Sequence, residues 1–149
     1  MIEDFRLNLT PSQPVSFSYD AVVSMCKKGE VANAIRLLKR NGQTIDGWTD
    51  VIQLGLRKLS VSHRINELLS LVFKFGLACP LEIRDLLREM FQQGDIPGFL
   101  KQAHRYGTCD GLDSEIDAAV EWLRQHGQRD GASAYRDKFE ALRRGRRLP

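Results

Sequence analysis

Long apolar runs are missing from this sequence. No stretch approaches the roughly 18 consecutive apolar residues that a membrane-spanning helix requires. The first four residues, Met1-Ile2-Glu3-Asp4, are acidic where a signal or transit peptide would be basic. We therefore expect an intracellular protein without a membrane partner, cytoplasmic in the first instance, with nuclear and organellar locations left open. The sequence also leaves open that the chain is an excised part of a longer protein.

Cysteine is scarce, and the cysteines are not spaced like the paired ligands of a metal site. Cys26, Cys79 and Cys109 form an odd, widely separated set, which is typical of reduced thiols inside a cell. Zinc sites usually show paired ligands at C-x2-C or H-x3-5-H spacing, and neither spacing occurs here. The phosphate-cradling motifs G-x-x-x-x-G-K and G-x-G-x-x-G are also missing. The sequence therefore predicts a non-catalytic protein that holds no metal and no cofactor.

Excess charge of one sign is nearly absent outside the C-terminus. The formal net charge is +3, and Arg143, Arg144, Arg146 and Arg147 alone supply +4, so the remainder of the chain sums to −1. A protein that binds nucleic acid through its folded body needs a basic surface on that body. We expect the terminal arginines to be a solvated end or to complement the dipole of the last helix, with an RNA-affinity or nuclear patch as the alternative.

Glycine, in contrast, recurs at regular intervals. One series of breaks falls at Gly29, Gly94 and Gly127, with Leu59–Ser62 near the middle of the long gap, and a second series interleaves with it. The second series contains Gly42, Gly76 and Gly107, with Gly145 as a looser member. Two breaks in roughly 33 residues predict two short helices per unit, which is the period of helical solenoids.

The segments between the breaks carry the apolar spacing of helices, as in Ile65, Leu68, Leu69 and Val72. The predicted fold class is all-α, and the predicted architecture is a right-handed α-solenoid of about four helical hairpins. We expect one repeat domain over residues 18–145, preceded by an extended segment, 1–17, and followed by a tail, 146–149. The eight predicted helices are Tyr19–Lys28, Glu30–Arg40, Trp48–Leu59, Ser62–Phe75, Leu81–Gln93, Ile96–Tyr106, Ser114–His126 and Ala132–Arg144.

Helix-terminal residues and aromatic residues give further expectations. The predicted N-caps are Ser18, Asp46, Ser62 and Asp113, Pro97 suits a first turn, and Gly42, Gly76 and Gly107 suit left-handed helix ends. We expect most aromatic rings at helical spacing to lie in the core. This group comprises Phe73, Phe75, Phe91, Phe99 and Trp122, while Trp48 and Tyr106, at element edges, are expected to be half-exposed.

Residues 17–42 resemble a pentatricopeptide repeat. The family's aromatic, polar, small and paired aliphatic positions are taken by Tyr19, Asp20, Ala21 and Val22-Val23, followed by the turn Cys26-Lys27-Lys28-Gly29, then Ala34 and a final Gly42. Fainter units open at Trp48–Ile52, Ile83–Leu87 and Ile116–Val120. The signature of the related tetratricopeptide family is not evident. The resemblance implies single-stranded RNA binding, with Asp20, Thr49, Arg84 and Asp117 at the base-reading position, where the family favours residues such as Thr49.

The same four residues are candidates for contact with a protein. Each follows the first apolar or aromatic anchor of its unit, and one residue step turns a side chain about 100° away from the buried stripe. Trp48 joins them because tryptophan and arginine dominate protein interfaces. The leading hypothesis is therefore an adaptor that binds a protein partner through Asp20, Trp48, Thr49, Arg84 and Asp117. The alternatives are a single-stranded RNA-binding module and a self-associating scaffold that forms homo-oligomers.

Overall fold

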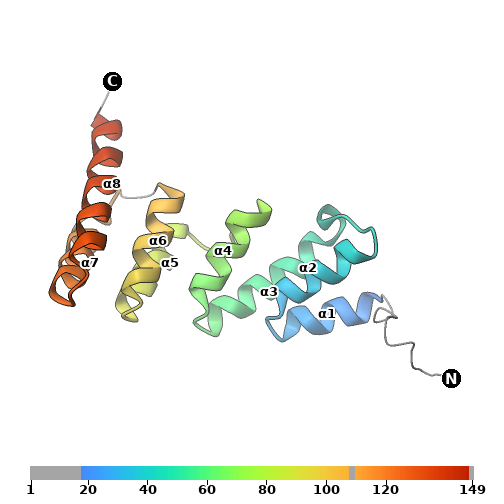
Figure 1. The fold of residues 1–149 in the computed structure, drawn as a ribbon. Coiled ribbons are helices and arrows are strands. Elements are labelled where there is room, and N and C mark those ends of the chain that lie inside the picture. The colour runs from blue at the N-terminus through green and yellow to red at the C-terminus, as the bar shows by residue number, and fades with distance from the viewer. Residues whose placement is uncertain (1–17, 108–109, 148–149) are drawn as a thin grey trace. The chain divides into compact units, whose positions relative to one another are not determined.

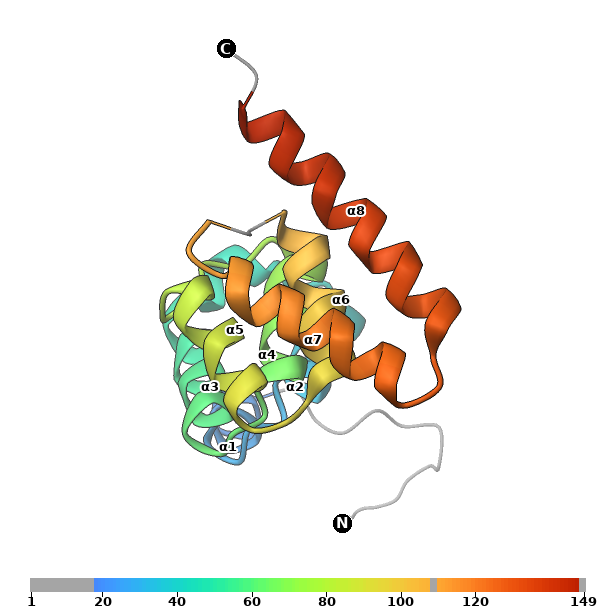
Figure 2. The same cartoon turned by 90° about the vertical axis from the view of Figure 1, so that its left-hand side faces the viewer.

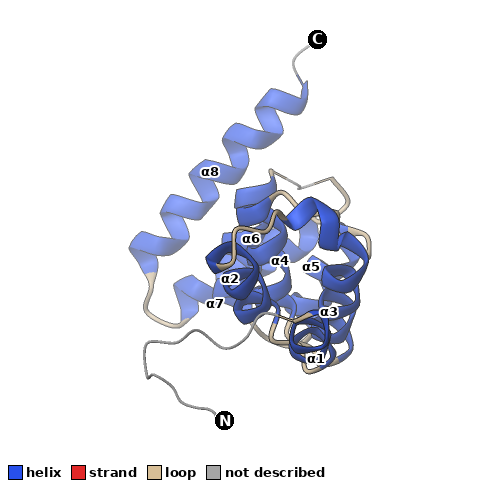
Figure 3. Ribbon diagram, turned by 90° about the vertical axis from the view of Figure 1, so that its right-hand side faces the viewer, coloured by secondary structure: helices blue, strands red, loops and turns tan. Residues whose placement is uncertain are grey.

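The computed structural model describes residues 18–107 and 110–147. Over these residues the protein is helical, with eight α-helices, one 3-10 helix and no strand (Figures 1 and 3). The prediction of an all-α protein with eight helices is confirmed. The predictions for segment 1–17, for Cys109 and for Leu148-Pro149 lie outside the described residues.

The helices follow one another with short connections. In chain order they are α1 (Tyr19–Lys27), α2 (Val31–Arg40), the 3-10 helix η1 (Ile45–Trp48), α3 (Thr49–Val61), α4 (Ile65–Phe75), α5 (Ile83–Gln92), α6 (Ile96–Tyr106), α7 (Asp113–Gln125) and α8 (Arg129–Arg147). Six of the predicted helices are close to these bounds. The predicted start of α4 at Ser62 is wrong, and α8 is longer at both ends than predicted, so the backbone of Arg146 and Arg147 is helical.

Four of the connections repeat the same turn. Gly29, Gly94 and Gly127 have φ angles of 79°, 86° and 80°, and His63 takes the corresponding place in the fourth turn with φ 60°. In each turn the amide of the following residue donates to a carbonyl five positions earlier, as from Glu30 to Met25 at 2.8 Å and from Arg64 to Leu59 at 2.9 Å. This pairing closes a helix and turns the chain into the next one. The break expected within Leu59–Ser62 therefore falls at His63, because the left-handed position is there.

Three glycines of the second series take the left-handed conformation predicted for them, but the looser member, Gly145, lies inside α8 and breaks no helix. Gly42, Gly76 and Gly107 have left-handed φ angles of 70°, 62° and 67°. Gly76 and Gly107 directly end α4 and α6. A side chain in this region of backbone conformation is strained, so glycine is the residue that suits these ends.

Two predicted helix starts agree with the structure. The Ser18 hydroxyl oxygen accepts from the amide of Ala21 at 3.0 Å, and Pro97 lies in the first turn of α6. The other predicted N-caps are wrong. Asp46 lies inside η1, because a 3-10 turn precedes α3; Ser62 lies in the turn before α4, whose N-cap is Arg64; and Asp113 is already the first residue of α7.

The chain divides into two compact units, and the division falls between Lys58 and Leu59, inside α3. In the first unit α1 packs on α2, and α2 contacts η1. Val22, Cys26, Val31 and Leu38 are fully buried there. Burial raises the pKa of the Cys26 thiol to about 11, so Cys26 is an unreactive core residue, in agreement with its helical spacing.

In the second unit each helix contacts the next two along the chain. α4 contacts α5 and α6, α5 contacts α6 and α7, and α6 contacts α7 and α8. The core includes Leu68, Leu87 and Phe99, together with one buried polar side chain, Gln102. Its amide donates to Asn66 Oδ1 and to Ser70 Oγ, both at 2.8 Å, and so joins α6 to α4. A buried amide with partners in fixed positions favours one register between these two helices.

Candidate functional site

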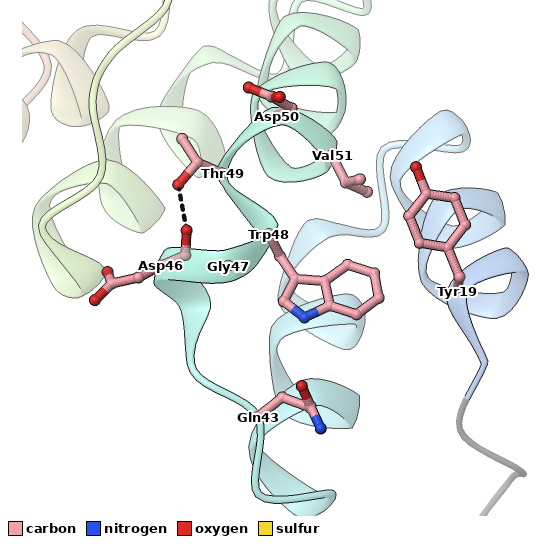
Figure 4. A pocket seen from close by; sticks show the side chains of 8 residues that line it. All are labelled: Tyr19, Gln43, Asp46, Gly47, Trp48, Thr49, Asp50 and Val51. Carbon is pink, nitrogen blue, oxygen red and sulfur yellow. Dashed lines mark hydrogen bonds between the residues drawn. The ribbon is translucent and has the colours of Figure 1, made fainter.

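A hollow of about 480 Å³ opens on the first unit, around the only tryptophan of that unit. Eight residues line it: Tyr19, Gln43, Asp46, Gly47, Trp48, Thr49, Asp50 and Val51 (Figure 4). They come from the start of α1, the loop after α2, η1 and the first turn of α3. We call this feature the aromatic hollow.

The turn between α2 and α3 fixes Trp48. η1 ends at Trp48 and α3 begins at the next residue, where the Thr49 hydroxyl donates to the carbonyl of Asp46 at 3.0 Å (Figure 4). This bond ties the first residue of α3 to the 3-10 turn before it. Trp48 is half-buried, as the sequence predicts from its place at an element edge.

The Tyr19 ring lies beside that of Trp48 and lines the same hollow. The ring centroids of Tyr19 and Trp48 lie 5.5 Å apart with an interplanar angle of 32°, and Val51 lies between them at one edge (Figure 4). Ser18 caps α1 directly before Tyr19 and so fixes where the helix starts. Tyr19 is 61% exposed, so a large part of its ring is open to a ligand.

The residues that line the hollow carry a net negative charge. None of its eight lining residues is lysine, arginine or histidine, and two are aspartates, Asp46 and Asp50. Both carboxylates lie at the margin and point away from the two rings (Figure 4). A site of this kind offers ring faces, which attract cations, within a negative local field. Its lining holds no group that would neutralise a phosphate.

The structure brings two of the five predicted binding residues together. Trp48 and Thr49 both line the aromatic hollow, and Asp20 is exposed beside Tyr19 in the first turn of α1. Arg84 and Asp117 are exposed in the second unit, on α5 and α7. A common face that contains all five residues stays a prediction.

Asp117 is already engaged within the chain. Arg143 Nη2 lies 3.1 Å from Asp117 Oδ1, and Arg143 Nε lies 2.8 Å from Asp113 Oδ1. The Arg143 side chain is only 18% exposed. Although its burial alone would lower the pKa of Arg143, hydrogen bonds and ion pairs with the two aspartates raise it. The expectation of a solvated end is therefore wrong for Arg143, which joins α8 to α7.

Several aromatic predictions need correction. The repeat pattern predicts Tyr19 as an anchor of the first unit beside its buried stripe, but Tyr19 lies at the exposed helix start. Helical spacing predicts Phe73 in the core, yet Phe73 is 53% exposed, with its ring 5.5 Å from that of Tyr106 and the Arg105 guanidinium 5.2 Å from its centroid. Phe99 is buried, as predicted, but Phe75, Phe91 and Trp122, which helical spacing also predicts in the core, are half-buried. Tyr106 is half-buried, as expected. Helical spacing identifies a face but not how far a neighbouring helix covers it.

The sequence patterns do not identify the other lining residues of the hollow. Gln43 and Gly47 carry no motif, and Asp50 and Val51 belong only to the faint repeat unit Trp48–Ile52. The pattern around Asp46 predicts a helix cap. The available signal is the short polar stretch between two predicted helices that ends in tryptophan, because loops that precede a helix often carry binding residues.

Metal and membrane sites are not evident in the described residues. Within 18–107 and 110–147, no three histidine, cysteine, aspartate or glutamate side chains converge where a metal ion could bind. Every helix in those ranges is too short or too polar to cross a lipid bilayer. Comparison of the chain with protein-family models, with curated proteins and with solved structures found no match.

Proposed function

We propose that the chain is a non-catalytic α-solenoid adaptor that binds a basic segment of a protein partner, with a lysine or arginine side chain in the aromatic hollow. The observation that carries this proposal is the Tyr19–Trp48 ring pair in a hollow lined by two aspartates and no basic residue. A guanidinium over an indole or phenol ring is attracted by the ring's negative face, and such a pair is worth about 0.5–1 kcal/mol at an exposed site and about 2 kcal/mol when it is desolvated.

The repeated turns support the repeat architecture. The same left-handed turn recurs at Gly29, His63, Gly94 and Gly127, roughly one helical-repeat period apart. In the second unit each helix also contacts the next two, which is how stacked hairpins bury stripes that a single hairpin leaves open. A stack of this kind presents loops and first helical turns along one edge, and the aromatic hollow is built from such a loop and two such first turns.

The same electrostatics favour a protein ligand over RNA at this site. Proteins that bind single strands combine stacking rings with a positively charged groove that follows the backbone. The aromatic hollow has the rings without the positive charge. Asp46 and Asp50 would repel a phosphate placed beside Trp48, whereas both would favour a cationic side chain.

Selection from a random peptide library with the full chain tests the proposal. We expect the enriched peptides to contain lysine or arginine, and we expect Trp48→Leu to lose them, because the larger ring face is gone. The matched control is Trp122→Leu, which makes the same substitution in the second unit, outside the aromatic hollow. This control should bind the enriched peptides as the parent does.

The contradicting outcomes are specific. Enriched peptides without basic residues, or peptides that bind Trp48→Leu as tightly as the parent, would refute the assignment of the hollow. Binding of a random single-stranded RNA pool that depends on Trp48, with no enrichment from the peptide library, would favour the RNA alternative.

A further inference from the structure

The second unit contains a separate cleft of about 350 Å³ between α7 and α8, which run antiparallel and in contact (Figure 2). Three arginines line it: Arg124 from α7, and Arg129 and Arg136 from α8. Val120 and Ala132 supply its apolar part. The cleft therefore combines a small apolar surface with three guanidinium groups.

The positive charge of this cleft is only partly compensated. Arg124 Nε donates to Glu121 Oε1 at 3.0 Å, and this pairing raises the pKa of Arg124. Arg136 Nε lies 3.7 Å from Asp137 Oδ1, but both side chains are more than half exposed, so water screens this ion pair. The lining contains three arginines and one carboxylate, that of Glu121, so its formal net charge is +2.

The spacing on α8 places the polar groups on one face. Arg129, Ser133 and Arg136 are at i, i+4 and i+7, and seven residues of helix span about 10 Å. Ser133 also lines the cleft, so a hydroxyl-bearing residue lies between the two arginines along the helix. Arg129 is the first residue of α8, where the helix dipole favours an anion.

We infer that this cleft binds the phosphate monoester of a phosphorylated serine or threonine in a partner peptide. Such a group carries about −1.5 to −2 charges at neutral pH and three strong acceptor oxygens, which match the surplus charge and the guanidinium donors of the cleft. A phosphodiester of RNA carries one charge, and RNA affinity requires an extended basic track rather than a single cleft with Glu121 beside it. This inference concerns the second unit and does not depend on the aromatic hollow.

A peptide titration of the full chain tests this inference. The probes are a short phosphoserine peptide, the same peptide with serine, and a single-stranded RNA of equal net charge. We expect binding of the phosphoserine peptide alone, with an affinity about tenfold or more weaker for the double variant Arg129→Gln/Arg136→Gln, because each arginine supplies charged hydrogen bonds. The matched control is Lys138→Gln/Arg144→Gln, which removes the same charge from exposed positions of α8 outside the cleft.

Three outcomes would overturn the inference. They are equal binding of the serine and phosphoserine peptides, an equal loss of affinity in the control variant, and tighter binding of the RNA that is lost in the cleft variant. Both double variants change side chains on one helix, and helical circular dichroism and melting temperature check that each variant folds as the parent does. A cleft variant that fails to fold is replaced by Ser133→Glu, which places a negative charge between the arginines and should abolish peptide binding.

Discussion

His63 Nδ1 lies 3.1 Å from Glu89 Oε2, which joins the turn before α4 to the last part of α5. His63 is also the one non-glycine residue with a positive φ angle in the described part of the chain, at 60°. The three turns of the same kind use glycine at this position. An ordinary side chain in the left-handed region costs roughly 1–2 kcal/mol, so the turn at His63 holds a strained residue.

Substitution of His63 by glycine and by alanine separates the strain from the Glu89 contact. Both variants lose the contact, and only glycine accepts the left-handed conformation freely. We expect His63→Gly to be more stable to urea than His63→Ala by about 1 kcal/mol. Equal stability of the two variants would contradict a left-handed residue at this turn.

Gly55 in α3 should not tolerate alanine. A Cβ atom at this position would lie 2.6 Å from Val31 Cγ2 and 3.2 Å from Cys26 Cβ. We expect Gly55→Ala to lower the free energy of unfolding by about 1–3 kcal/mol, although alanine is the better helix former. Gly131→Ala in α8 is the matched control, because a Cβ there meets nothing within 4 Å, and it should raise stability by up to about 1 kcal/mol. A stabilising Gly55→Ala would refute the close packing of α3 in the first unit.

Glu115 should make part of the stability depend on pH. Its burial opposes ionisation, but hydrogen bonds from its own backbone amide, from Arg88 and from Ser114 outweigh this effect and lower the pKa of Glu115 below its usual value. Because the folded pKa is the lower one, this contribution is complete above the unfolded pKa and is lost as the pH falls through the folded pKa. We expect Glu115→Gln to lose less stability than the parent between about pH 7 and about pH 3, as measured by urea unfolding. If Glu115→Gln lost as much stability at acid pH as the parent does, the result would contradict a carboxylate stabilised by Arg88.

The helices could be predicted from the sequence because their signals are local. Glycine spacing and apolar periodicity predict α6 with the bounds that the structure has, and Ser18 is identifiable as a cap from its position before an apolar run. The turn at His63 is misplaced by one residue or more because histidine is not typical of a left-handed backbone. Tyr19 and Phe73 are misassigned because coverage by other helices depends on packing, which no local pattern contains.

The candidate site was only half predictable for the same reason. Trp48 and Thr49 are identifiable from residue type and register. The contribution of Tyr19 depends on how α1 packs beside η1, and the 3-10 turn before α3 has no sequence signature of its own. The acidic character of the hollow follows from Asp46 and Asp50, which are individually visible in the sequence but cannot be assigned to one surface without the fold.

The indole N–H resonance of Trp48 provides the most direct test of cation binding in the aromatic hollow. The full chain is titrated with the amide of acetyl-arginine, and separately with the amide of acetyl-citrulline, which has nearly the same shape without the charge. We expect a saturable shift of the Trp48 resonance with arginine, a much smaller one with citrulline, and no shift for Trp122, because only a cation gains from the ring faces and the nearby aspartates. An unmoved Trp48 resonance, or equal shifts with the two compounds, would contradict cation binding in the hollow.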